Sequence, residues 1–293
     1  MSSYTLSPTP GVRSHPGDAP ELPELPEGVE GHPTWAPWTA PAALLAGLTV
    51  TLLVGVVLAV VVAVFGGSVT GHQSTVDIVG TFLQDAALIG AAIVFAGLSG
   101  GRWRPEQFGL RGTHVGRAIG WALLGLVASL LFTDIWSVLL HNHQSEQIVH
   151  QLGADHEGVA RYAVALLVCV AAPVAEEFFF RGFFFTALRN WHGTPLAVLL
   201  TGLTFGAVHL GSAPVVYLVP LAFLGMVLCG VYLRTRSLYP CIGLHLVNNS
   251  LAFGVAEGWG WQIGVLIAAS LAIVGLGAAG LARWRPAGAL APA

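Results

Sequence analysis

The segment VALLVCVAAPVAEEFFFRGFFF, residues 164–185, decides the fold class and locates the candidate chemistry. It is long enough to cross the hydrocarbon core of a bilayer as a helix, which takes roughly 17–25 residues. Three charged residues interrupt it: Glu176, Glu177 and Arg181. A charge at the middle of a spanning helix costs roughly 2.5–3.5 kcal/mol on insertion scales, so such groups normally face a cavity or a partner. The segment therefore predicts a membrane helix that carries a polar functional site.

The composition of the whole chain is that of a polytopic membrane protein. Hydrophobic residues make up 55% and charged residues 9%, with a mean hydropathy of +0.73, whereas about a quarter of a soluble domain is charged. We predict an all-α fold with about eight transmembrane helices, because the apolar segments are too long for barrel strands. The predicted spans are residues 42–66, 78–99, 118–140, 160–188, 194–211, 213–233, 238–255 and 261–282.

The arginines predict the orientation in the membrane. All twelve basic residues are arginine, and ten of them define every second connection: Arg102, Arg104, Arg111, Arg117, Arg181, Arg189, Arg234, Arg236, Arg283 and Arg285. Under the positive-inside rule this places both termini of a multi-pass protein in the cytoplasm. Arg161 disagrees with the pattern. The arginine-only, alanine- and glycine-rich composition favours a bacterial plasma membrane.

The chain divides into a tail and a membrane domain. Residues 1–40 are rich in proline and glutamate, which predicts a disordered cytoplasmic tail. Trp35 and Trp38 precede the first span, where an interfacial aromatic belt is expected. A transmembrane domain follows at residues 41–285, and residues 286–293 form a short C-terminal tail. Three widely spaced cysteines in apolar segments indicate neither a disulfide framework nor a thiolate metal site.

Three short motifs carry the candidate catalytic residues, and each contains a four-residue step. They are Glu176-Glu177-x-x-x-Arg181, Phe205-x-x-x-His209 and His245-x-x-x-Asn249. Residues four apart share a helix face, so Glu177 can pair with Arg181. Glu176 is rotated from its neighbour by about 100° and stays available. We therefore predict one charge-compensated carboxylate and one free carboxylate.

The roles of these groups follow from their chemistry. Glu176 suits a general base that takes a proton from water, and His209 could orient that water or protonate a leaving amine. His245 and Asn249 could donate hydrogen bonds to an oxyanion. The alternative is a Zn²⁺ site with Glu176, His209 and His245 as ligands, although the sequence lacks the compact H-E-x-x-H arrangement of many zinc proteases.

These three motifs, in this order and on separate predicted spans, resemble the CAAX protease and bacteriocin-processing family over residues 160–255. The resemblance implies an intramembrane endopeptidase whose active-site positions match Glu176, Glu177, Arg181, His209, His245 and Asn249. It also implies that the first glutamate and the first histidine activate water, with or without a metal. Some bacterial members are tied to bacteriocin self-immunity or to scaffolding.

Two rival functions and one geometric conflict stay open at this stage. A proton-coupled transporter could use Glu176, His209 and His245 as a relay, and an immunity or assembly factor would be catalytically silent. For the protease, the expected partners are a peptide or membrane-protein substrate and the lipid bilayer, and no nucleic acid. A straight-helix count separates Glu176 and His209 by depth. A kink near Pro173 or Gly182, or a later start of the fifth span near Gly193 and Pro195, would reconcile them.

Overall fold

The computed structural model describes residues 25, 31–65, 73–100, 103–140 and 159–283. These residues form helices and short connections and contain no β-strand. This confirms the predicted all-α polytopic membrane fold. The helices are α1 (Thr39–Val64), α2 (Gln73–Gly100), η2 (Pro105–Phe108), α3 (Val115–Leu139), α5 (Val159–Leu166), η3 (Leu167–Ala171), α6 (Ala172–Glu177), η4 (Phe178–Phe184), α7 (Phe185–Ala207), η5 (Val215–Tyr217), α8 (Leu218–Thr235), α9 (Leu238–Ala256) and α10 (Gln262–Arg283).

Six helical stretches among the described residues are long and apolar enough to cross a membrane. They are Thr39–Val64, Ile78–Ser99, Val115–Leu139, Arg161–Ala207, Val215–Thr235 and Gln262–Leu281. The predicted fourth and fifth spans form one helical run, and α9, which carries the polar residues of the third motif, is not among the six. The predicted count of eight is therefore not confirmed.

A break at His192 and Gly193 divides the long helical run into two antiparallel halves. His192 has φ −117° and ψ 24°, and Gly193 has φ 78° and ψ −174°. Glycine adopts this positive φ without the steric cost that a Cβ would add. Beyond the break α7 returns along η4, so the rings of Phe205 and Phe180 lie 5.2 Å apart.

The position of this break removes the depth conflict. At about 1.5 Å per residue, Glu176 lies about 25 Å before Gly193 and His209 about 24 Å after it. Because the chain reverses between them, both residues reach the same level. The helix before the break is about 50 Å long by the same rise. It is therefore longer than the hydrocarbon core of a bilayer, which is about 30 Å thick.

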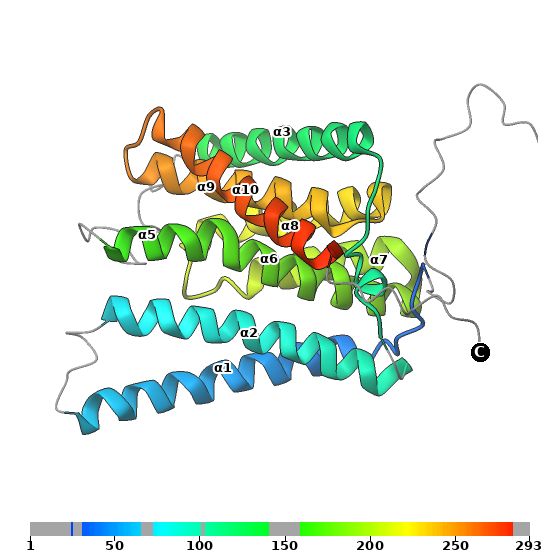
Figure 1. Cartoon of the computed structure of the whole chain (residues 1–293), viewed down its shortest axis with the longest axis horizontal. Helices are drawn as coiled ribbons and strands as arrows, with labels where there is room; N and C mark the ends of the chain where they lie inside the picture. The colour runs from blue at the N-terminus through cyan, green and yellow to red at the C-terminus, as the bar shows by residue number, and fades with distance from the viewer. Residues whose placement is uncertain (1–24, 26–30, 66–72, 101–102, 141–158, 284–293) are drawn as a thin grey trace, which may run out of the picture.

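The helices that carry the motifs form the interior of the bundle. In the most apolar stretch of Arg161–Ala207, half of the residues are buried inside the protein. The corresponding share is 6% in α1 and in α10. Figure 1 shows α1 and α2 side by side along one edge of the bundle and α3 along the other, with α5 and α6 between them. The exposed apolar faces of the peripheral helices are those expected to face lipid, while the inner helices hold the polar groups.

Glycines allow α7 and α8 to approach closely. A Cβ on Gly206 would lie 2.5 Å from the carbonyl oxygen of Leu218, and one on Gly225 would lie 2.9 Å from the Cα of Gly202. Small residues at such contacts let helix backbones meet in membranes. This packing holds the end of α7, and with it His209, against the rest of the bundle.

The segment before α1 is packed rather than free. Trp35 is only 3% exposed, and its ring lies 4.8 Å from Phe108 and 5.3 Å from Phe183. The Asn190 side chain donates hydrogen bonds to the carbonyls of Pro33 and Trp35. The ordered chain thus begins before the boundary predicted at residue 41, and Trp35 is a core residue, whereas Trp38 is exposed. The remaining predicted tail residues, 1–24 and 26–30, and residues 286–293 lie outside the described residues.

The exceptional arginine of the charge pattern has a local partner. Arg161, near the start of α5, forms an ion pair with Glu257 after α9, with Nε and Oε2 3.1 Å apart. The charge of Arg161 is therefore compensated locally by a residue that follows α9.

Candidate active site

Two π-helical stretches, η3 and η4, flank the adjacent glutamates. Pro173 at the start of α6 lacks a backbone N–H, and η3 directly precedes it. Wide turns of this kind are uncommon and occur frequently at functional sites. The hydroxyl of Thr186 donates to the carbonyl of Arg181, five residues back, at 3.2 Å.

Glu177 and Arg181 form a fully buried ion pair. Nη1 of Arg181 donates to Oε1 of Glu177 at 2.8 Å, and both side chains are 0% exposed. Nη2 of Arg181 donates to the carbonyl of Gly225 at 3.1 Å. The pairing predicted from the four-residue spacing is therefore present, and it joins η4 to α8.

The same carboxylate also holds His245 of α9. Nδ1 of His245 lies 2.8 Å from Oε1 of Glu177. Because an ionised carboxylate only accepts hydrogen bonds, this contact assigns the proton of the imidazole to Nδ1. In the neutral ring Nε2 then carries the lone pair, and it is the atom turned toward Glu176.

His209 is held in the corresponding way at the end of α7. Its Nδ1 lies 2.7 Å from the carbonyl oxygen of Phe205. A carbonyl is also an acceptor only, so Nδ1 carries the proton here too. Nε2 of His209 is thereby free to accept a hydrogen bond or to take up a second proton.

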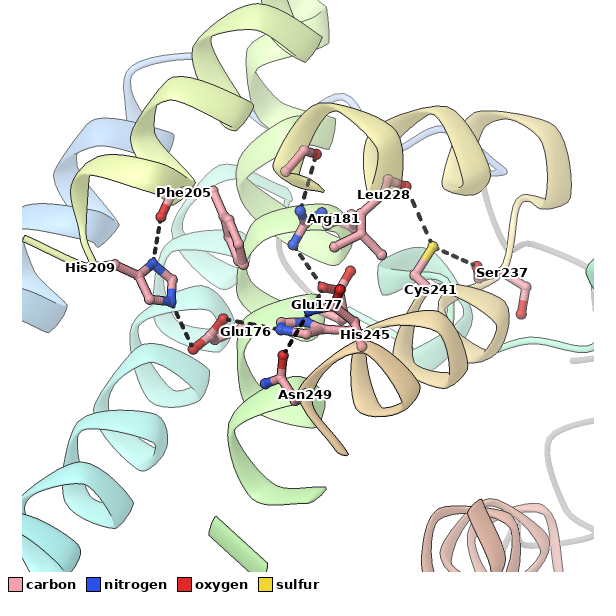
Figure 2. A network of polar contacts seen from close by, with 12 residues as sticks. Glu176, Glu177, Arg181, Phe205, His209, Leu228, Ser237, Cys241, His245 and Asn249 are labelled. Carbon is pink, nitrogen blue, oxygen red and sulfur yellow. Dashed lines mark hydrogen bonds and ion pairs between the residues drawn. The ribbon is translucent and has the colours of Figure 1, made fainter. Parts of the chain in front are cut away.

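Glu176 lies between the two imidazoles, as Figure 2 shows. Its Oε1 is 4.0 Å from Nε2 of His209, and its Oε2 is 3.9 Å from Nε2 of His245. Oε2 is buried and has no hydrogen-bond partner among the described residues. The separations are too long for direct hydrogen bonds, and polar groups at such distances are commonly bridged by water.

Phe205 forms an apolar wall of this cluster. Its ring centroid lies 5.0 Å from that of His209 and 5.7 Å from that of His245, and the Arg181 guanidinium carbon is 4.5 Å from it. One residue therefore orients His209 through its carbonyl and contacts three charged or titratable groups through its ring. The sequence marked Phe205 only as a motif position.

Asn249 lies at the edge of the cluster and is already engaged. Its Nδ2 donates to the carbonyl of Val168 in η3 at 3.0 Å, and its Oδ1 accepts from Asn248 at 3.3 Å. The shared face of His245 and Asn249 is present, because both project toward the same cluster in Figure 2. In this arrangement Asn249 ties α9 to η3.

A second buried carboxylate belongs to the surroundings of the site. Asp85 on α2 is 5% exposed, and its Oδ2 has no hydrogen-bond partner among the described residues. Its charge and that of Glu176 act on each other, and α2 packs against α6. The polar interruption of an apolar span was the only sequence signal for Asp85.

The arrangement offers three donors that face one space. Glu176, His209 and His245 present the oxygen and nitrogen atoms of the Zn²⁺ site considered from the sequence. Within the described parts of the chain, however, no group of three His, Cys, Asp or Glu side chains meets the geometry of a metal site.

Comparison with known protein families gives one match. Residues 158–251, about a third of the chain, match the family described as Type II CAAX prenyl endopeptidase Rce1-like. This segment belongs to the CAAX protease family. No curated protein and no solved structure matched the chain.

The CAAX protease segment contains all three motifs, from the glutamate pair to Asn249. The helices that it supplies, α5 to α9, are the inner ones of the bundle, whereas α1, α2, α3 and α10 lie outside it. At family level this match supports an intramembrane endopeptidase that acts on a peptide substrate. The residues beyond the segment include Asp85, so the surroundings of the site extend past the matched part.

Proposed function

We propose that the chain hydrolyses peptide bonds at a site within the membrane, through a water molecule activated by Glu176 and the two histidines. The observation that carries this proposal is the pairing of each Glu176 oxygen with an imidazole Nε2 at about 4 Å. A water between these groups would lie within reach of a base and of two nitrogen atoms held by their own partners. Such preorganisation is what a hydrolytic site requires.

Glu176 is the proposed general base. It takes a proton from water while the water oxygen forms a bond to the carbonyl carbon of the scissile peptide. The carbonyl oxygen becomes an oxyanion. The proton then passes to the amide nitrogen, the C–N bond breaks, and a carboxylic acid and an amine leave. Glu176 is ionised again at the end of the cycle.

The two histidines differ in their Nδ1 partners, and this difference suggests separate roles. Nδ1 of His245 donates to a carboxylate, which fixes the ring so that Nε2 faces the site and can contact the oxyanion. Nδ1 of His209 donates to a backbone carbonyl, which leaves its Nε2 able to accept a hydrogen bond from the attacking water. Arg181 balances the charge of Glu177, so the pair supports His245 without adding net charge.

Zn²⁺ remains the alternative for activating water. Bound by Glu176, His209 and His245, the ion would act as a Lewis acid and lower the pKa of its water. The metal-free reaction is proposed here because each Glu176 oxygen faces an imidazole Nε2 across a gap that suits one bridging water. Metal content and activity measured on the same purified samples distinguish the two.

The test is cleavage by the full-length protein in detergent. The substrates are a farnesylated CAAX peptide, its unprenylated counterpart and a panel of membrane-protein segments. We expect Glu176→Gln to lower kcat by about 10²–10⁴-fold, the usual contribution of general-base catalysis. Asp134→Asn, at an exposed carboxyl on α3, is the control and should retain wild-type activity.

Three results would each decide a part of the proposal. Cleavage that needs Glu176 and both histidines in metal-free samples supports it. Activity that follows stoichiometric zinc replaces the metal-free step while keeping the protease. No cleavage by a folded wild type, combined with pH-driven flux in vesicles, would favour the transporter and refute proteolysis.

A further inference from the structure

A cavity of about 320 Å³ lies away from the catalytic cluster, at the face that carries the arginine-rich connections. It is bordered by the segment before α1, the connection leading to α3, and the corner between α8 and α9. None of the six motif residues lines it. The residues that matter for its chemistry are Gly31, His32, Arg111, Gly112, Thr235 and Arg236.

The cavity concentrates positive charge. Arg111 and Arg236 line it, and Arg189 is close enough to act on His32. Burial lowers the pKa of His32, and the charges of Arg189, Arg236 and Arg111 lower it further. Within the described residues, neither Arg189 nor Arg236 forms an ion pair with a carboxylate. Glu106 partly offsets the charge of Arg111, so the excess lies with the other two arginines.

The backbone around the cavity is fixed by hydrogen bonds between distant segments. Nε of Arg111 donates to the carbonyl of Arg236, and the hydroxyl of Ser237 donates to the carbonyl of Arg111 at 2.6 Å. Thr113 Oγ1 donates to the carbonyl of Thr235 at 2.9 Å. These bonds join the connection before α3 to the α8–α9 corner, so the backbones that carry Arg111 and Arg236 are held together.

Arg236 occupies its place at a conformational cost. It ends α8 with φ 53°, the one non-glycine residue with positive φ among the described residues. Glycine is the usual residue at such a helix end, because side chains with a Cβ disfavour this region. Arg236 lines the cavity and its charge acts on His32, at a position where a glycine would suit the backbone better. Strained residues of this kind cluster at ligand sites.

We propose that this cavity binds a phosphate group, and that Arg236 holds its oxygens together with the Arg111 N–H groups that are not bonded to the carbonyls of Arg236 and Gly31. The planar guanidinium matches phosphate with paired N–H donors, and basic pockets at helix ends are suited to lipid head groups. The shared chemistry is an anionic phosphate, whose source is either a phospholipid or free phosphate. The site is independent of the proposed proteolysis, since it shares no residue with the catalytic cluster.

The experiment measures binding to delipidated full-length protein in detergent. The probes are phosphatidylglycerol, phosphatidylcholine and inorganic phosphate, each titrated at low and at moderate salt. Arg236→Gly removes the guanidinium while suiting the αL backbone, and Arg236→Gln provides a second variant if the first does not fold. Arg234→Gln is the matched control, because Arg234 has the same charge two residues away and lies over Trp121, outside the cavity.

We expect both Arg236 variants to bind phosphatidylglycerol at least tenfold more weakly than wild type, and Arg234→Gln to bind within twofold of it. Preference for phosphatidylglycerol over both other probes assigns the site to an anionic lipid. Equal binding of inorganic phosphate assigns it to a free anion. Binding that is unchanged in both Arg236 variants, or equal for phosphatidylcholine and phosphatidylglycerol, overturns the proposal.

Discussion

The two adjacent glutamates differ in what surrounds them, and their variants should therefore fail in different ways. Glu177 is fully buried and balances Arg181, whereas Glu176 has no short ion pair. We expect Glu177→Gln to lower the free energy of unfolding by about 3–5 kcal/mol, because it strands a buried guanidinium. Glu176→Gln should abolish cleavage with a much smaller loss of stability. Thermal unfolding in detergent, followed by tryptophan fluorescence, measures both.

A double variant separates the charge from the packing at this pair. Replacing Arg181 by methionine in the Glu177→Gln background removes the unpaired charge, so part of the lost stability should return. If Glu176→Gln and Glu177→Gln instead destabilise the protein equally, the division between a structural and a catalytic carboxylate is wrong.

At this scale the sequence predicted contacts that depend on one helix and missed those that depend on several. The four-residue spacing was enough for Glu177 with Arg181, because neighbours on a helix face are fixed locally. It could not place the His245 ring on Glu177, since that contact joins η4 to α9 across the bundle. Nor could it show that Asn249 binds the Val168 carbonyl, because an ordinary helix pattern contains no signal for π-helical turns.

The contact between α7 and α8 is the element-scale feature that positions His209. A methyl group at Gly206 would collide with backbone atoms of α8, including the Leu218 carbonyl oxygen at 2.5 Å. We expect Gly206→Ala to cost about 1–3 kcal/mol of stability, as overpacking generally does, and to lower kcat by shifting His209. Unfolding midpoints and single-turnover cleavage rates are the measurements.

Gly230→Ala is the matched control for this helix contact. A Cβ at Gly230, on the partner helix α8, would meet nothing within 4 Å. Alanine favours a helix over glycine by up to about 1 kcal/mol, so this variant should be neutral or slightly stabilised. An equal loss of stability in both variants would mean that close approach of the helices is not the reason for Gly206.

The segment before α1 adds a pH-dependent term to stability through His32. Burial and the charges of Arg189, Arg236 and Arg111 lower its pKa in the folded protein, while the unfolded chain keeps the ordinary value near 6.5. The unfolded state thus binds more protons between these two pKa values, so stability rises with pH in that window and levels off above about 6.5. Below the folded pKa the full penalty is present.

We expect His32→Gln to weaken this rise, with the wild type gaining more stability than the variant between pH 5.5 and 7.5. Melting temperatures in phosphate-free buffer and lipid-poor detergent measure the difference. His192→Gln, at an exposed histidine on α7, should keep the wild-type dependence. A His32→Gln profile that parallels the wild type would contradict the electrostatic coupling of these groups.

For the whole molecule, the helical membrane fold was predictable because apolar length alone identifies spanning segments. The exact length of the fourth helix was not. The break at His192 and Gly193 lies in the connection predicted between the fourth and fifth spans, but the helix before it continues beyond residue 188. This extension brings Glu176 and His209 to one level. The packing of Trp35 could not be predicted either. A proline-rich composition predicts disorder, and it carries no signal for the burial of one aromatic side chain between distant helices.

Trp35 shows how the segment before the first helix contributes to the integrity of the bundle. Its ring is buried against Phe108 of η2 and Phe183 of η4, so it joins three separated parts of the chain directly beside the η4 turn. We expect Trp35→Ala to cost about 3–5 kcal/mol, the usual range for deleting a buried aromatic ring. The loss should appear in the melting temperature and, through η4, in cleavage. Trp38→Ala is the control, because Trp38 is 59% exposed, and its loss should change stability far less. Similar melting temperatures for the two variants would mean that residues before α1 are dispensable for the fold.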